Sequence, residues 1–326
     1  MGLTGWRGDK MQTNIIYNED CLMLLQRMPN NTINLIYIDP PFNCKRDQEF
    51  GMPSWKDNNQ EPNRIDEILP IIPDDTGTRN YLRFMYLRIK EMHRVLRDDG
   101  SIYVHCDWRV NSYLRLLLDE VFGRDYYINE LIWYYGGPSQ TSKYFPRKHD
   151  TIISYSKKDA IYNEVFGELP EYLKKRARKD PDGRLWVDQR LGELLPATID
   201  KMKKEGRIFE TTNGNLRRKQ YLDEMQGSQI NDVWDIRIVN SQAKERVNYP
   251  TQKPEALLER IIKASSNEGD IVADFFCGSG TTLAVAEKLG RKWIGCDSNK
   301  VAVDISIERI RRVKGKIVYF VETRGK

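Results

Sequence analysis

The stretch that decides the fold is Ile271-Val272-Ala273-Asp274-Phe275-Phe276-Cys277-Gly278-Ser279-Gly280, which runs into a helical pattern ending near residue 289. The apolar run predicts a buried strand, and the two glycines predict a tight loop before the helix. A second apolar run, 293–296, ends in Asp297. Free N–H groups at a helix start can hold a ligand, and an acidic residue ending the second strand suits a ribose diol. On its own, however, the loop is better explained as an ordinary turn, and Leu283 stands where a pyrophosphate-binding fingerprint needs its third glycine.

Strands and helices alternate on both sides of this loop, which predicts an α/β fold with a mostly parallel, doubly wound sheet and helices on both faces. Upstream, the apolar run 33–38 is typical of a buried parallel strand. Asp98-Asp99-Gly100 predicts a turn into the next strand. The expected helices and strands in this part are helices 78–96 and 110–122 and strands 101–105, 131–135 and 151–155.

Length and composition limit the classes of protein. The chain has 326 residues, of which 40% are hydrophobic and 30% charged, so it can bury a sizeable core. No apolar run approaches about 18 residues, and residues 1–13 lack a secretory apolar region, so we expect a cytoplasmic protein. Five scattered cysteines and three histidines show no close metal-ligand spacing, so no metal site is expected.

The composition changes near residue 156, after which basic residues and aromatics interleave. We therefore expect three segments: 1–156 and 249–326 form one catalytic domain, and 157–248 is an inserted domain. Basic clusters are usually solvated faces, but clusters that interleave with aromatics also suit contacts with phosphates. The candidate phosphate-contacting residues are Lys174, Lys175, Arg176, Arg178, Lys179, Arg217, Arg218 and Lys219.

A second motif, Asp39-Pro40-Pro41-Phe42, follows the run 33–38. Two prolines fix the backbone and present the Asp39 carboxylate and the Pro40 carbonyl beside an aromatic ring. Such a group can accept hydrogen bonds from an exocyclic amine while Phe42 stacks on the ring that carries it. Taken alone, a strand that ends in a Pro-Pro turn explains the motif equally well.

Together, the two motifs resemble those of the amino-DNA methyltransferases, which use S-adenosylmethionine to methylate adenine N6 or cytosine N4. The target-amine motif of that family is D/N/S-P-P-Y/F, and its cofactor loop is D-P-F-x-G-x-G. Here the amine motif comes first, with the insert 157–248 between the two. This order resembles the family's β class, in which the target recognition domain lies between the motifs. The sequence departs from the family at Phe275, where proline is usual, and at Phe42, where tyrosine is commoner.

Three further stretches resemble segments of the same class: 18–22 its G-D-C-L segment, 249–254 its H-P-T-Q-K-P motif, and 290–297 its G-R-x-x-I-G-x-E/D segment. The resemblance implies that Asp297 takes the ribose hydroxyls and Asp20 the adenine amine, although Asp20 is equally a helix N-cap. It also implies that Asp274 faces the amino group of the cofactor. The cofactor-binding residues implied in this way are Asp20, Cys21, Thr251, Lys253, Asp274, Phe276, Cys277, Gly278, Gly280, Thr281 and Asp297.

The implied reaction is a direct methyl transfer to the amine of a base flipped out of duplex DNA. The catalytic residues that it uses are Asp39, Pro40, Pro41 and Phe42. No cysteine follows a proline, so the cysteine nucleophile of cytosine-C5 enzymes is absent. An acidic residue before Pro-Pro is typical of adenine enzymes in the family, so we favour adenine N6 over cytosine N4. An RNA amine methyltransferase, a dinucleotide-binding oxidoreductase and a non-catalytic DNA-binding subunit are the more distant alternatives. The resemblance implies double-stranded DNA as the partner, with the basic residues of the insert as its candidate DNA-binding residues, and a nucleoid-associated protein of a prokaryotic or phage host cell. It adds a homodimer and a cognate restriction endonuclease as candidate partners.

Overall fold

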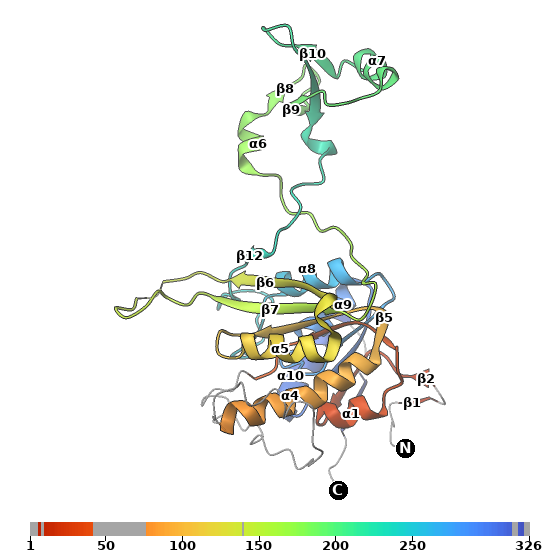
Figure 1. Cartoon of the computed structure of the whole chain (residues 1–326), viewed down its shortest axis with the longest axis vertical. Helices are drawn as coiled ribbons and strands as arrows, with labels where there is room; N and C mark the ends of the chain where they lie inside the picture. Colours follow the sequence, from red (N-terminus) through yellow and green to blue (C-terminus); the bar gives the residue numbers. More distant parts are fainter. Residues whose placement is uncertain (1–5, 8–9, 42–75, 139, 315–318, 323–326) are drawn as a thin grey trace. The chain divides into compact units, whose positions relative to one another are not determined.

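The computed structural model describes residues 6–7, 10–41, 76–138, 140–314 and 319–322. The chain divides into two compact units (Figure 1). The first consists of Met1–Asn163 and Asp232–Lys326, and the second is Glu164–Asn231.

The first unit is built on a nine-stranded sheet, counted over the described residues, with the order β12-β6-β7-β5-β4-β13-β14-β3-β15. All pairings in this sheet are parallel except those of β7, which runs antiparallel to both β5 and β6. All six residues of β4 are buried, as expected for a strand covered on both faces. The predicted mostly parallel α/β sheet is confirmed. The strands are β3 (Ile15–Asn18), β4 (Ile33–Ile38), β5 (Leu96–Cys106), β6 (Tyr127–Tyr134), β7 (His149–Ser156), β12 (Val233–Asp235), β13 (Ile271–Asp274), β14 (Lys292–Asp297) and β15 (Tyr319–Glu322). A short separate hairpin joins β1 (Trp6–Arg7) and β2 (Lys10–Met11).

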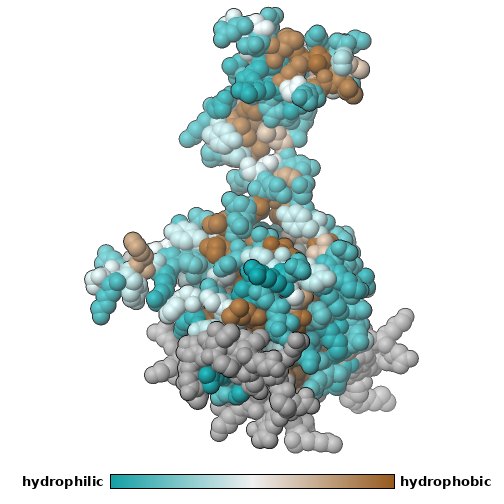
Figure 2. All heavy atoms as spheres, in the orientation of Figure 1, coloured by the Kyte–Doolittle hydropathy of each residue, from teal (hydrophilic) through white to brown (hydrophobic). Residues whose placement is uncertain are grey.

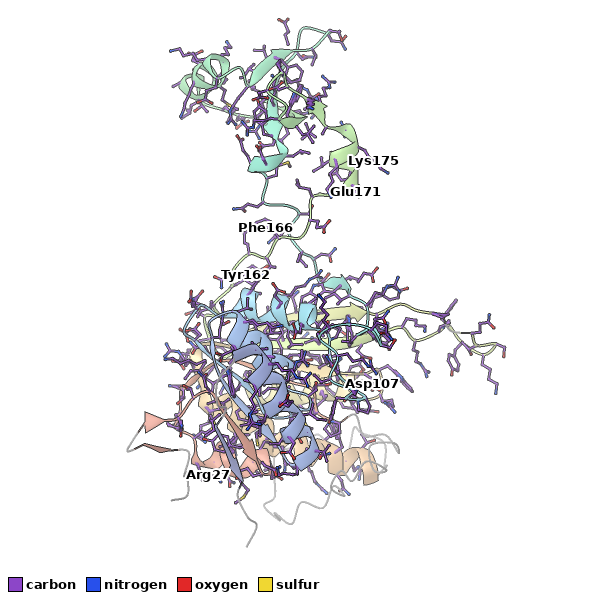
Figure 3. The ribbon with its side chains drawn as sticks, turned by 180° about the vertical axis from the view of Figure 1, so that it is seen from behind. Arg27, Asp107, Tyr162, Phe166, Glu171 and Lys175 are labelled. Atoms are coloured by element: carbon purple, nitrogen blue, oxygen red, sulfur yellow. The ribbon has the colours of Figure 1, made fainter. Side chains whose placement is uncertain are left out.

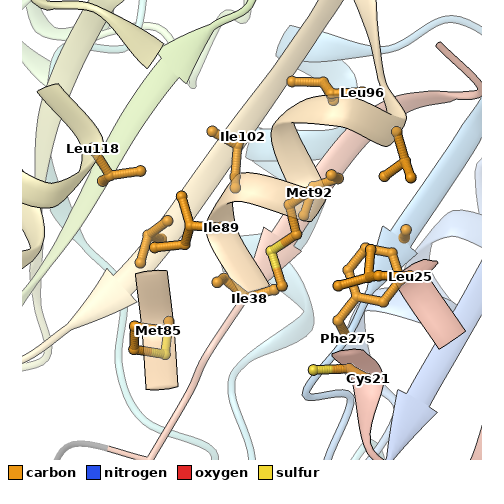
Figure 4. Packing of buried hydrophobic residues seen from close by; sticks show 14 of the residues in the cluster. Cys21, Leu25, Ile38, Met85, Ile89, Met92, Leu96, Ile102, Leu118 and Phe275 are labelled. Carbon is orange, nitrogen blue, oxygen red and sulfur yellow. The ribbon is translucent and has the colours of Figure 1, made fainter. Parts of the chain in front are cut away.

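Two groups of helices pack against this sheet. In the first group α4 contacts both α1 and α5, and in the second α9 contacts both α8 and α10 (Figure 1). The apolar side of α4 supplies Met85, Ile89 and Met92 to a buried cluster with Ile38 and Ile102 (Figure 4). The helices are α1 (Cys21–Arg27), α4 (Thr76–Val95), α5 (Asn111–Phe122), α8 (Glu255–Ser265), α9 (Thr281–Lys288) and α10 (Lys300–Lys314), and a 3-10 turn, η2, spans Arg124–Tyr126.

The strand expected to begin at Ser101 begins earlier. β5 starts at Leu96, which pairs with Ile33 of β4, and the next paired residue, Leu35, lies opposite Ser101. The turn at 98–100 was expected to mark the start of the strand, and this boundary was wrong. Those residues form an irregularity inside β5, because the pairing resumes in the same strand after them.

The second unit has its own small sheet and core. Four antiparallel strands lie in the order β10-β11-β9-β8, and Trp186, Val187, Tyr221 and Leu222 are buried. Its elements are α6 (Glu171–Arg176), β8 (Arg178–Lys179), β9 (Leu185–Arg190), α7 (Pro196–Lys204), β10 (Ile208–Glu210), β11 (Leu216–Tyr221) and η3 (Leu222–Glu224).

The boundaries of this unit are narrower than the expected insert 157–248. Residues 232–248 belong to the first unit, where β12 pairs with β6 and the indole N–H of Trp133 donates to the carbonyl of Ile236 at 2.7 Å. At the other side, the N–H groups of Ile161 and Asn163 donate to the carbonyls of Asp99 and Ala264. These contacts with the large sheet and its helices are long-range, and the composition shift near residue 156 does not reveal them.

Candidate active site

The two sequence motifs meet at one edge of the large sheet. β13 is parallel to both β4 and β14, with Ala273 paired to Ile36 and Asp274 paired to Gly295. The carboxyl ends of the three strands therefore lie side by side. Asp39 follows the first of these strands, and Asp274 and Asp297 end the other two.

Asp39 is a largely buried carboxylate with two different oxygens. Its Oδ2 atom forms an ion pair with the Lys253 ammonium, and the two side chains are 18% and 12% exposed. Its Oδ1 atom is buried and has no hydrogen-bond partner among the described residues. Pro40 is buried and Pro41 half-buried, whereas Phe42 lies outside the described residues. The carboxylate thus keeps one free acceptor atom at the sheet edge.

The glycine loop depends on two residues that have no side chain. Gly278 and Gly280 have φ values of +49° and +71°, a region that side chains disfavour. A Cβ atom on Gly280 would come within 2.7 Å of the Ser306 hydroxyl oxygen, and one on Gly278 would lie 3.4 Å from the Tyr249 ring. The N–H group of Cys277 donates to the carbonyl of Cys296 at 3.0 Å, which ties the loop to β14.

Two carboxylates, Asp274 buried and Asp297 half-buried, hold the loop by hydrogen bonds. Asp274 accepts from the Phe276 N–H at 3.1 Å and from the Thr282 hydroxyl at 2.6 Å, so both of its oxygens serve the loop and α9. Burial raises the pKa of Asp274 to about 7. Asp297 accepts from the N–H groups of Gly278 and Asn299 at 2.9 and 2.8 Å, and burial raises its pKa as well.

Asp20 lies in the turn before α1, the helix that follows β3. Its Oδ1 atom accepts from the Leu22 N–H at 2.8 Å, so the predicted N-cap is confirmed. Its Oδ2 atom accepts from Arg88 at 2.6 Å, and Arg88 is 2% exposed. Cys21, the first residue of α1, is buried beside it. The contact of Asp20 with a cofactor adenine stays a prediction.

The segment 249–254 contacts the glycine loop and the start of α9. The Tyr249 ring lies against Gly278, and burial, aided by the Asp297 charge, raises the pKa of its hydroxyl. Gln252 is buried and holds the segment by donating to the Glu245 carbonyl and accepting from the Val247 N–H. Thr251 is exposed. At the start of α9, the Thr281 hydroxyl donates to the Lys253 carbonyl at 3.2 Å and accepts from the buried Arg309 at 2.8 Å.

A second polar network adjoins Asp39. The Tyr37 hydroxyl and the His105 Nδ1 atom are 2.9 Å apart, and the His105 Nε2 atom lies 3.3 Å from an Asp150 oxygen. His105 is fully buried and its ring packs edge-on against Trp133. The sequence analysis missed this network and Arg88, Tyr249, Gln252 and Arg309. For Arg88 and His105 a signal existed, because each is a polar residue in an otherwise apolar helix face or strand.

The candidate DNA-binding residues all lie in the second unit, where they divide into two groups. Arg217, Arg218 and Lys219 on β11 contact Asp188, Gln189 and Asp180 of the same unit, each within 3.0 Å. The group 174–179, on α6 and β8, is exposed, although Lys174 pairs with Glu171 at 2.8 Å. The exposed residues of this group are Lys174, Lys175, Arg176, Arg178 and Lys179.

The described residues contain no group of His, Cys, Asp and Glu side chains that could hold a metal ion. Their four cysteines, Cys21, Cys106, Cys277 and Cys296, are buried, and burial raises the pKa of each thiol. A buried, protonated thiol is a poor nucleophile. None of the helices in this part of the chain is long and apolar enough to cross a membrane.

The chain is similar to several known proteins. A family model described as DNA methylase matches residues 33–308. Type II methyltransferase M.EcaI of Enterobacter cloacae is 30% identical to the chain, covering 96% of it and 72% of the relative. DNA adenine methyltransferase YhdJ of Escherichia coli (strain K12) is 28% identical, covering 92% of the chain and 83% of the relative. The structure of the PvuII DNA methyltransferase (cytosine-N4-specific) superposes with a TM-score of 0.54 at 17% identity, over 95% of this chain and 97% of that one, which shows a shared fold.

Proposed function

The chain belongs to the DNA methylase family, and on that premise we propose that it methylates the exocyclic N6 amine of an adenine flipped out of duplex DNA. DNA methyl transfer follows from the family, and the choice of adenine is the further step. The observation that carries the proposal is the Asp39 carboxylate, buried at the sheet edge with one oxygen paired to Lys253 and the other free to accept an amine hydrogen. Cytosine N4 is the alternative, because the same acceptor suits either amine.

The choice of adenine rests on the acidic residue before Pro-Pro. A carboxylate is a stronger hydrogen-bond acceptor than the serine hydroxyl found there in cytosine-N4 enzymes. The relatives include a DNA adenine methyltransferase of Escherichia coli, whereas the PvuII enzyme, named as cytosine-N4-specific, shares only the fold at 17% identity.

The residues around the glycine loop suit S-adenosylmethionine as the methyl donor. The cofactor would supply a methyl group activated by a sulfonium. Gly278 and Gly280 give the loop its positive φ values and its close packing, and the methionine part of the cofactor would pass along this loop. Asp297 at the end of β14 would accept from ribose hydroxyls. Asp20 would take the adenine amine. Asp274 would not contact the cofactor directly, because it is only 3% exposed and its two oxygens hold Phe276 and Thr282, whereas Asp297 is half-buried and Asp20 exposed.

The amine would be oriented by Asp39 Oδ1 and the Pro40 carbonyl, which turn the nitrogen lone pair toward the methyl group. Phe42 would stack on the flipped base. Since no covalent intermediate is needed, the catalytic effect would come from orientation and from preorganised charge. The exposed basic group on α6 and β8 would contact DNA phosphates, which gives the second unit the role of a target recognition domain. We further propose that the chain forms a homodimer, that it acts together with a cognate restriction endonuclease, and that it is located at the nucleoid.

The Asp39→Ala variant tests this mechanism. We expect methyl transfer to plasmid DNA to be lost while the dissociation constant of S-adenosylmethionine stays within a few-fold of wild type. Because the two quantities are measured separately, by label transfer and by equilibrium binding, a loss of cofactor affinity as large as the loss of rate would place Asp39 in the cofactor site instead.

A further inference from the structure

The connection between β6 and β7, residues 135–148, carries exposed aromatic and basic side chains. It projects from the first unit (Figure 1), and Figure 2 shows hydrophilic and hydrophobic side chains together on it. Phe145 is 95% exposed and Tyr144 56% exposed. The segment contains three basic residues, Lys143, Arg147 and Lys148, and no acidic residue. An almost fully exposed phenylalanine in a basic segment indicates a contact surface for a polyanion with apolar parts.

This loop leaves the sheet at the same edge as Asp39. Val104 of β5 pairs with Ile38, the residue before Asp39, and Cys106 pairs with Thr151 of β7. Tyr134, the last residue of β6, pairs with His149, the first residue of β7. Because β7 is antiparallel to its neighbours, its start lies level with the carboxyl ends of β4, β5 and β6. The loop and the candidate amine acceptor therefore lie along one edge of one sheet.

The base of the loop is ordered by specific contacts. The Arg147 guanidinium lies 3.8 Å from the centre of the Trp108 ring and 4.7 Å from that of Tyr144. Trp108 is 51% exposed and follows β5. The Tyr135 N–H donates to the Lys148 carbonyl, and the Lys148 ammonium donates to the Pro138 carbonyl, each at 3.1 Å. Phe145 lies in the sequence between Tyr144 and the arginine that stacks on the Tyr144 and Trp108 rings, while its own ring is almost fully exposed.

We propose that the loop 135–148 is a DNA-contacting wedge in which Phe145 enters the base stack beside the target base, while Lys143 and Arg147 contact the flanking phosphates. The inference rests on the proposed function, because it assigns the step that delivers the base to Asp39. A base that leaves the duplex leaves a gap, and an apolar side chain inserted between base steps stabilises the opened duplex. Duplex DNA satisfies both features of the loop, since it offers phosphates to the cations and base faces to the ring.

The recognition sequence is first determined from plasmid DNA that the wild-type protein has methylated. The test then compares Phe145→Ala with wild type on two duplexes that contain this sequence. In one duplex the target base is normally paired, and in the other it lies opposite an abasic site. Loss of one base–aromatic stacking contact corresponds to a decrease of about 5- to 150-fold in the rate constant. We expect kcat/KM to fall by that factor on the paired duplex and by less than about threefold on the abasic one, where opening costs little. Phe145→Trp should retain the wild-type rate on both.

The matched control is Tyr162→Ala, which removes an aromatic ring that is 60% exposed in the same unit. Tyr162 follows β7 at the opposite end of the sheet, where the neighbouring Ile161 N–H donates to Asp99, and Figure 3 shows it away from Asp107, which follows β5. This variant should match wild type on both duplexes. A Phe145→Ala variant that also matches wild type, or one that loses the same factor on both duplexes, would overturn the wedge. The absence of methyl transfer by the wild-type protein would instead overturn the proposed function.

Discussion

Replacing Lys253 with methionine tests whether this residue positions the catalytic carboxylate. The ammonium pairs with Asp39 Oδ2, and both side chains are less than one-fifth exposed. Methionine keeps an unbranched side chain of similar length and removes the charge. The carboxylate then loses the partner that fixes its plane, and with it the orientation of the Oδ1 atom toward the amine. A hydrogen bond to a charged group contributes about 1.5–3 kcal/mol, so the chemical step should slow by about 10- to 150-fold.

The assay is a single-turnover measurement of methyl transfer with cofactor and DNA both saturating, together with the cofactor dissociation constant of each variant. Lys253→Arg should recover most of the rate, because it keeps a cation near Asp39. Lys263→Met is the matched control. Its ammonium pairs with Glu259 at 2.6 Å near the C-terminal end of α8, outside the contacts that join Lys253, Thr281 and Arg309. A Lys253→Met variant with a normal saturating rate and weakened cofactor binding would refute the positioning role and make Lys253 a cofactor ligand.

Three further predictions follow from the carboxylates and the basic surface. Asp297→Ala should weaken cofactor binding by about 10- to 150-fold, the equivalent of one charge-assisted hydrogen bond, and an unchanged dissociation constant would remove Asp297 from the site. The pKa of Asp274 is about 7, above its ordinary value. The native state therefore binds this proton more tightly than the unfolded state does, so the free energy of unfolding falls as the pH rises toward 7. Urea unfolding of Asp274→Asn between pH 4.5 and 7 should lack this term, which is at most about 1.4 kcal/mol per pH unit, whereas a slope equal to that of wild type would contradict the assignment. Neutralising the exposed cluster in the second unit should weaken DNA binding and flatten its salt dependence, and an unaltered slope would make the cluster a solvated face. The residues changed together are Lys174, Lys175, Arg176, Arg178 and Lys179.

The sequence predicted the strands and helices that carry the two motifs because their signals are local. The run 33–38 and the run before Asp274 are apolar enough to specify buried strands, and glycines with positive φ mark the loop between β13 and α9. Alternation of strands and helices then favoured parallel neighbours, which brought Asp39 and the glycine loop to one edge.

The sequence could not predict the contacts that join distant segments. Nothing in the pattern around Lys253 indicates that its ammonium pairs with Asp39, and a solvated lysine at a helix start was as good an interpretation. The return of 232–248 to the large sheet depends on the pairing of β12 with β6, again a long-range contact. Arg88 occupies the buried face of α4, but its partner Asp20 lies far away in sequence. Pairing of this kind depends on tertiary geometry, which the local periodicity of the sequence does not contain.

The identity of the methylated nucleoside tests the central claim most directly. The purified chain is incubated with S-adenosylmethionine and unmethylated plasmid DNA, the DNA is hydrolysed to nucleosides, and the products are identified by mass spectrometry, with Asp39→Ala as the matched control. We predict N6-methyladenine with the wild-type protein and unmodified nucleosides with the variant. N4-methylcytosine without N6-methyladenine would contradict the choice of adenine, and unmodified nucleosides from the wild-type reaction would contradict methyl transfer to DNA itself.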